Sequence, residues 1–267
     1  MDQYLAAFLM GVVEGLTEFL PISSTGHLIL LGYAIGFHGP PGKVFEIAIQ
    51  LGAILAVVVL YFPKLVGILR GMWAAGSAER FYAINIILAF IPAMVLGATL
   101  HGPITSMLFN PWVVSVALIL GGIAIIVIER RVHRPTIHSV PEIGPLTALL
   151  IGLGQALAMI PGTSRSGATI IAALLLGVER RTAAEFSFIL AIPTMLAAAA
   201  YSLFKARAEL SLDGFGLIAV GFVTAFVVAL LVVRAVITFI GRIGFTPFGW
   251  YRIGLGSLML VVLLLTA

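Results

Sequence analysis

The chain has 267 residues, of which 61% are hydrophobic and only 10% are charged. Soluble domains carry about 25% charged residues, and a mean hydropathy of +1.17 leaves more apolar surface than a water-soluble globule of this length could bury. We therefore predict an integral membrane protein and exclude a soluble enzyme, a disordered protein and a nucleic-acid binder. The chain has no cysteine, which excludes disulfides, zinc thiolate sites and a cysteine nucleophile.

Clear apolar segments, separated by charged or turn-rich stretches, are candidates for helices that cross the bilayer. Such a helix takes about 20 apolar residues. The segments lie at 44–62, 83–101, 111–129, 182–204, 214–237 and 247–266. We predict six transmembrane helices from them.

Two further apolar regions, 4–36 and 144–177, are interrupted at their centres by proline, glycine and hydroxyl residues. The interruptions run from Pro21 to Gly26 and from Pro161 to Gly167. A helix cannot continue unchanged through such a sequence, and each half is too short to cross the bilayer comfortably. We predict two re-entrant hairpins, each made of two half-helices joined by a loop at membrane depth. Two ordinary kinked spans are the alternative.

The basic residues indicate how the chain is oriented. If each hairpin enters and leaves on one side, only Lys43, Lys205 and Arg207 fall on the side opposite the main basic group. The positive-inside rule makes the side with the larger group cytoplasmic. Both termini are then periplasmic, and the first hairpin dips in from the periplasm. The larger group consists of Lys64, Arg70, Arg80, Arg130, Arg131, Arg134, Arg180, Arg181, Arg234 and Arg242.

The two interrupted regions resemble each other, and three predicted spans follow each of them. Because three is an odd number, the two halves must be inverted relative to each other. We predict an all-α polytopic membrane protein whose single domain, 1–267, consists of two inverted repeats, 1–135 and 136–267. This plan is typical of transporters and places the functional site where the two loops meet.

The ionisable residues of the first interrupted region are functional candidates, because charge inside a membrane is costly. Glu14 and Glu18 share a helix face and could hold a divalent cation that bridges phosphate oxygens; two acids facing water are the alternative. His27 follows Ser24 by about one helical turn. It could act as general acid or base, or activate Ser24 as a nucleophile, although a lone histidine is often structural.

Each loop leads into a half-helix, whose free N–H groups and positive dipole end favour an anion. Arg165 lies at the tip of the second loop. It could grip phosphate oxygens with two parallel hydrogen bonds, or it could form a salt bridge with Glu14 or Glu18. Two helix N-termini, an arginine and two carboxylates together suit phosphoryl chemistry.

The stretches EGLTEFLPISSTGH, from Glu14 to His27, and PGTSRSG, from Pro161 to Gly167, resemble the two signature motifs of a known family. This is the bacterial undecaprenyl-diphosphate phosphatase family, first known as bacitracin-resistance proteins. The resemblance covers essentially the whole chain. It implies hydrolysis of undecaprenyl diphosphate to the monophosphate in the bacterial inner membrane, which recycles the carrier lipid for peptidoglycan synthesis. It also implies dependence on a divalent cation, Mg²⁺ or Ca²⁺.

The resemblance also implies roles for individual residues. Glu14 and Glu18 become metal or acid–base carboxylates, Ser24 the candidate nucleophile, His27 its acid–base partner and Arg165 the diphosphate clamp. Attack by Ser24 and attack by a metal-activated water stay open. The residues expected to line or shape the phosphate site are Ser23, Thr25, Gly26, Thr163, Ser164, Ser166 and Gly167.

The sequence also leaves an alternative function and an alternative oligomeric state open. A transporter or flippase for an anionic or lipid-phosphate substrate is the alternative that the inverted repeat alone favours. The expected partners are a polyprenyl diphosphate lipid and the bilayer, and the sequence leaves a homodimer open. Because Glu14, Glu18 and His27 belong to the hairpin that dips in from the periplasm, we expect a site accessible from that side.

Overall fold

The computed structural model describes residues 2–37, 39, 43–108, 110–131, 134–205, 207 and 214–266, except for the side chains of 100–107. Over these residues the fold is helical, with one isolated β-bridge between Ile137 and Val178, and the predicted all-α class is confirmed. The helices are α1 (Gln3–Thr17), α2 (Ser24–Ile35), α3 (Val44–Leu60), α4 (Phe62–Gly71), α5 (Ala78–Leu108), α6 (Pro111–Arg131), α7 (Pro145–Ala156), α8 (Arg165–Leu175), α9 (Arg180–Lys205), α10 (Phe215–Ile243) and α11 (Thr246–Thr266), with 3₁₀ turns η2 (Val140–Glu142) and η3 (Leu157–Met159).

Five helices in the described part of the chain, α5, α6, α9, α10 and α11, are long and apolar enough to span a membrane. A sixth span results if α3 and α4, which meet at a bend of 71°, are taken together. All six predicted apolar segments are therefore helical. Large apolar side chains such as Leu120, Leu231 and Leu264 are exposed on the outer faces of α6, α10 and α11. Lipid contact accounts for such a surface, which would be a liability in water.

Both predicted interruptions are breaks between short helices. The first separates α1 from α2, and the second separates α7 and η3 from α8. The residue before each second half-helix has the same unusual backbone, with φ of 71° at Ser23 and 73° at Ser164. Non-glycine residues rarely adopt this left-handed region. At Ser164 the side chain also caps α8, because its Oγ accepts a hydrogen bond from the Gly167 N–H at 3.2 Å.

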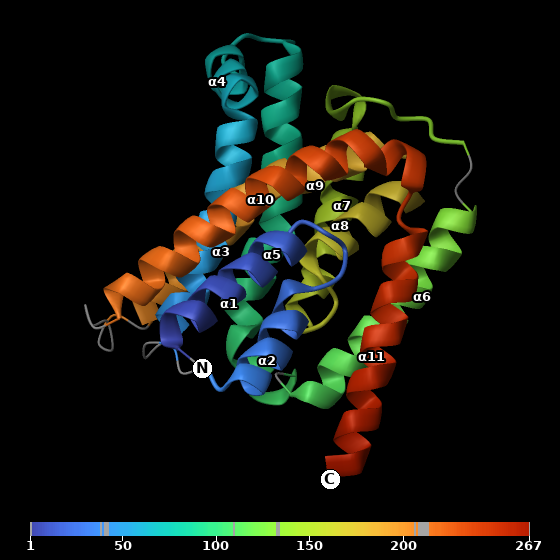
Figure 1. The fold of residues 1–267 in the computed structure, drawn as a ribbon. Coiled ribbons are helices and arrows are strands. Elements are labelled where there is room, and N and C mark those ends of the chain that lie inside the picture. Colours follow the sequence, from blue (N-terminus) through green and yellow to red (C-terminus); the bar gives the residue numbers. More distant parts are fainter. Residues whose placement is uncertain are drawn as a thin grey trace.

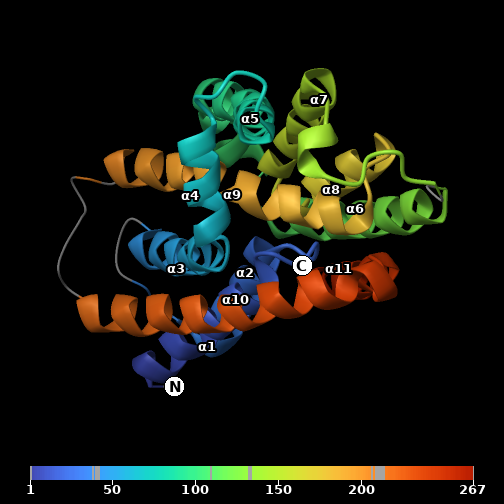
Figure 2. The ribbon, with the colours of Figure 1, turned by 90° about the horizontal axis from the view of Figure 1, so that it is seen from above.

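Two of the short helices pack against long helices from the other half of the chain: α1 lies against α10, and α7 lies against α5 (Figure 1). The long helices α6 and α11, also from different halves, pair with each other. Seen from above, α10 and α11 form one layer and the α5–α7 pair lies at the opposite side (Figure 2). Two of these crossings require glycine. A Cβ on Gly11 would lie 2.6 Å from the Gly221 carbonyl oxygen, and a Cβ on Gly152 would lie 2.3 Å from that of Ala89.

A buried carboxylate fixes one end of the bundle. Glu129, near the end of α6, accepts hydrogen bonds from the backbone N–H of Phe245, at 2.8 Å, and from that of Thr246. It also pairs with Arg180 at the start of α9, with 2.8 Å between Nε and Oε1. The N-terminus of α11 is thereby held against α6 and α9, which sets the direction in which α11 runs toward the two loops.

Candidate functional site

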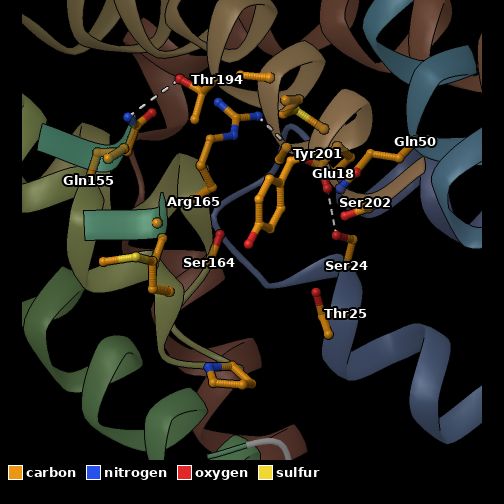
Figure 3. Close-up of a pocket in the computed structure, with 18 of the residues that line it drawn as sticks. Glu18, Ser24, Thr25, Gln50, Gln155, Ser164, Arg165, Thr194, Tyr201 and Ser202 are labelled. Carbon is orange, nitrogen blue, oxygen red and sulfur yellow. Dashed lines mark hydrogen bonds and ion pairs between the residues drawn. The ribbon is translucent and has the colours of Figure 1, made fainter. Parts of the chain in front are cut away.

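The two interrupted segments meet inside the bundle. Ser166 Oγ, in the first turn of α8, donates to the carbonyl oxygen of Leu20 in the first loop at 2.8 Å. Arg165 Nη2 donates to Glu18 Oε1 at 3.2 Å. A hydroxyl hydrogen bond and an ion pair therefore join segments that are far apart in the sequence. Figure 3 shows Arg165 and Glu18, the partners of the ion pair.

Glu18 is the central acceptor of this arrangement. It caps the end of α1, where its side chain is buried. While Oε1 faces Arg165, Oε2 accepts a hydrogen bond of 2.6 Å from Ser24 Oγ at the start of α2. Such a short bond to a carboxylate is typical of a charge-assisted interaction. Ser24 therefore has a carboxylate as its hydrogen-bond partner.

Arg165 is held in place by more than the carboxylate. Its Nη1 donates to the Ser187 carbonyl oxygen at 2.9 Å, and its Cζ lies 5.7 Å from the centroid of the Phe19 ring. The side chain is only 12% exposed, and its Nε has no hydrogen-bond partner. The salt bridge to Glu18, one of the two alternatives for Arg165, is confirmed. The guanidinium has more N–H groups than these contacts use, and it lines the cavity described below, so it can also donate to a ligand there.

A cavity of about 520 Å³ opens beside the ion pair. Polar groups of both loops form one part of its wall, and apolar residues of α5 and α9 form another. Figure 3 labels several of the polar residues that line it. The polar lining includes Glu18, Ser23, Ser24, Thr25, Gln50, Gln155, Ser164, Arg165 and Thr194. The apolar lining includes Phe90, Ala93, Met94, Ala98, Met195, Ala197 and Ala198. The cavity is large enough for an anionic head group with part of an apolar chain.

Glu14 lies one helical turn before Glu18 and is 1% exposed. It does not line the cavity, and its Oε1 has no hydrogen-bond partner among the residues that the structure describes. The described residues contain no group of three or more His, Cys, Asp or Glu side chains that could hold a metal ion. Protein Mg²⁺ sites often use one or two carboxylates and complete the shell with substrate phosphates and water. Glu14 and Glu18 supply the number of carboxylates that such a site uses.

His27 faces a different neighbour from the one expected. Its Nδ1 lies 2.8 Å from the Ser23 carbonyl oxygen, and its Nε2 lies 2.6 Å from the Tyr251 hydroxyl, with the two rings stacked. Because a carbonyl only accepts, Nδ1 carries the proton, and in the neutral ring Nε2 accepts from Tyr251. His27 does not line the cavity. The structure thus pairs Ser24 with Glu18 and links His27 to α11.

The remaining predicted residues divide into two groups. Ser23, Thr25 and Ser164 line the cavity. The others shape the loops behind it. Ser166 is fully buried, Thr163 offers its carbonyl to Arg252, and Gly26 and Gly167 lie in the first turns of α2 and α8. The loops are therefore brought together as expected, although only part of the predicted set faces the space that a ligand would occupy.

Arg252 is the residue that the motifs did not reveal. It lies in α11 with 0% exposure, and its guanidinium donates to carbonyl oxygens of both loops and of α6. Gln155 and Thr194, which also line the cavity, belong to no expected site either. One signal in the sequence could have found Arg252. It is a charged residue within the apolar segment 247–266, and such residues are functional candidates by default.

This fold and this site define a multi-span helical membrane protein with a cavity between two broken helices, polar at the loops and apolar along α5 and α9. Residues 7–258 match the family model described as bacitracin resistance protein BacA. The chain belongs to this bacterial family. It is 57% identical to undecaprenyl-diphosphatase 2 of Paramagnetospirillum magneticum, over 98% of this chain and 99% of that one. It is 54% identical to undecaprenyl-diphosphatase of Parvibaculum lavamentivorans, over 97% and 96% of the two chains.

Proposed function

We propose that this protein is a membrane phosphatase that hydrolyses undecaprenyl diphosphate to undecaprenyl phosphate and inorganic phosphate. The family and the names of its relatives support this activity. The observation that carries it is the convergence of Ser24, Glu18 and Arg165 on one cavity. This activity recycles the carrier lipid for peptidoglycan synthesis in the bacterial inner membrane and confers resistance to bacitracin, which the family is named for.

The cavity has a polar part and an apolar part, which suit the diphosphate and the isoprenoid chain of a lipid diphosphate. The diphosphate belongs beside Arg165 and the first turns of α2 and α8, where an arginine and helix N-termini favour negative charge. The isoprenoid chain belongs along the apolar wall of α5 and α9, against residues such as Phe90, Met94 and Met195. Burial of a chain on that wall would contribute binding energy of roughly 25 cal/mol per Å² of apolar surface.

The Ser24–Glu18 hydrogen bond supports a nucleophilic route. Ser24 Oγ attacks the terminal phosphorus, its proton passes to Glu18, and the bond to the bridging oxygen breaks to release undecaprenyl phosphate. Water then attacks the phosphoseryl phosphorus, and the Ser24 oxygen takes its proton back from Glu18 as inorganic phosphate leaves. Arg165 stabilises the charge on the phosphoryl oxygens in both steps. His27 has an indirect role in this chemistry: its Nδ1 donates to the Ser23 carbonyl oxygen and so holds the backbone directly before Ser24.

Glu14 and Glu18 are the residues that would hold Mg²⁺ or Ca²⁺ in this proposal. A bound cation would neutralise part of the charge on the phosphate oxygens. The buried, partnerless Glu14 Oε1 supports the assignment, because a carboxylate oxygen without any partner is costly at such depth.

The structure also supports the two inverted repeats, 1–135 and 136–267. Matched features recur at one constant spacing along the chain: the strained serines Ser23 and Ser164, the crossing glycines Gly11 and Gly152, and the positive-φ glycines Gly36 and Gly177 after α2 and α8. Exchanging the halves turns the contact of α1 with α10 into that of α7 with α5. In this arrangement the two broken regions are re-entrant hairpins, a plan that also favours a transporter or flippase as the second candidate function.

A direct assay tests the proposed activity. The purified protein in detergent should release inorganic phosphate from a polyprenyl diphosphate with Mg²⁺ or Ca²⁺ present, lose the activity with EDTA and regain it with added cation. Arg165→Lys should be slower by on the order of 10²-fold, because an ammonium cannot reproduce the guanidinium fork. Arg234 is an exposed arginine on α10. The variant Arg234→Lys is therefore the matched control and should keep the wild-type rate. Folded wild-type protein that releases no phosphate from any polyprenyl diphosphate would exclude the phosphatase and leave the transporter.

The role of Ser24 has its own test. We expect Ser24→Ala to lower kcat at least about 10²-fold, and we expect acid quenching of the wild type during turnover to trap phosphoserine. Ser115→Ala, which removes a fully buried hydroxyl of α6 outside the cavity, should be nearly as active as wild type. A substantial residual rate in Ser24→Ala, with no trapped phosphoserine, would favour attack by a metal-activated water.

The orientation is tested by labelling single cysteines in a chain that has none of its own. With both termini in the periplasm, a membrane-impermeant thiol reagent added to intact spheroplasts should label Lys43→Cys and Lys205→Cys. The same reagent should label Arg70→Cys and Arg134→Cys only after the membrane is permeabilised. Labelling of the second pair in intact spheroplasts would contradict the orientation and, with it, the periplasmic access to the site.

A further inference from the structure

Arg252 makes an unusual set of contacts for a charged residue in the middle of an apolar helix. Its side chain is fully buried, and all its hydrogen bonds go to backbone carbonyls. Nη1 donates to Pro21 at 3.1 Å and Thr163 at 2.8 Å, Nη2 donates to Ala117 at 3.1 Å and Gly162 at 3.0 Å, and Nε donates to Leu118 at 3.2 Å. A guanidinium has five N–H donors, so its whole donor set is used.

The charge of Arg252 has no carboxylate partner among the described residues. An unpaired buried charge costs several kcal/mol, and carbonyl dipoles alone compensate it here. Packing α6 against α11 does not need this charge, because apolar and glycine contacts such as Gly122 with Gly249 already hold the two helices together. The arginine must therefore be explained by the loops that it binds.

Three of the five carbonyls that Arg252 binds lie just before the catalytic stretches of the two loops, and the other two belong to α6. Pro21 comes two residues before Ser23, and Gly162 and Thr163 come directly before Ser164 and Arg165. Arg252 does not line the cavity itself, so it acts on a ligand only through these loops. The hydrogen bonds from Arg252 hold the backbone in place just before Ser23 and Ser164, the two serines with positive φ.

We propose that Arg252 is a positioning residue that sets the distance between the two phosphate-binding loops and so aligns Ser24 with Arg165 for phosphoryl transfer. This inference rests on the proposed phosphatase activity. A lysine cannot take over the role, because one ammonium is a compact charge with three donors and has no fork that spans both loops. Displacement of one loop by about 1 Å can slow a reaction on the order of 10²-fold.

The test compares wild type with Arg252→Lys, Arg252→Met and the control Arg180→Lys, all as monodisperse protein in detergent. Arg180 lies in the buried Glu129 pair outside the cavity, so its variant reports on a loss of stability alone. Farnesyl diphosphate serves as the substrate, and orthovanadate and inorganic phosphate serve as inhibitors. Arg252→Met replaces the buried charge with a shorter apolar chain and supplies a second variant if Arg252→Lys folds poorly.

We expect both Arg252 variants to lose on the order of 10²-fold in kcat with little change in KM, and orthovanadate, which resembles the transition state, to bind them weaker by a similar factor. An inhibition constant does not depend on the fraction of protein that is folded. A structural defect alone would therefore lower the apparent kcat and leave the inhibition constant of orthovanadate unchanged. An unchanged inhibition constant, or wild-type kinetics in both variants, would overturn the role of Arg252. The proposed phosphatase function would still stand in that case, because the wild-type protein is active. An inactive wild type would overturn the proposed function itself.

Discussion

The buried ion pair between Arg165 and Glu18 is the interaction on which the site depends. It joins the end of α1 to the start of α8, two segments that break inside an apolar bundle. Removing either partner would leave an uncompensated buried charge, at a cost of roughly 3–5 kcal/mol. The same pair prepares the site for an anion. Glu18 also accepts a hydrogen bond from Ser24, and Arg165 lines the cavity with a guanidinium that has more N–H donors than its protein contacts use.

The ion pair can form only because the irregular backbone around it is satisfied at membrane depth. In hydrocarbon, unpaired backbone carbonyls are costly, and broken helices are tolerated only where protein or a water-filled cavity receives them. Here Arg252 donates hydrogen bonds to the carbonyl oxygens of Pro21, Gly162 and Thr163, and Ser166 donates one to that of Leu20. The loops thus obtain their partners from side chains, and a polar cavity can exist between helices whose outer faces are apolar.

The sequence predicts the spans and both breaks, because length, hydropathy and proline–glycine–serine clusters act locally along the chain. It also places Glu18, Ser24 and Arg165 in one site, although it leaves open whether Arg165 binds a carboxylate. Contacts between distant segments are harder to predict. The short spacing from Ser24 to His27 suggested a pair, but Tyr251 on α11 takes the His27 ring. Arg252 stands outside every motif, since its partners are backbone carbonyls that leave no pattern of residue types.

If the two loops form one diphosphate site, as we propose, a bound diphosphate should protect both of them from thiol labelling. Thr25→Cys places a thiol in the first turn of α2, directly after the first loop, and Ala158→Cys places one in η3, just before the second loop; both positions line the cavity. Farnesyl diphosphate should slow labelling at both positions, with half-protection at the same concentration, and should leave the exposed Trp73→Cys unaffected. Protection at only one position, or at widely different concentrations, would contradict a single site built from both loops.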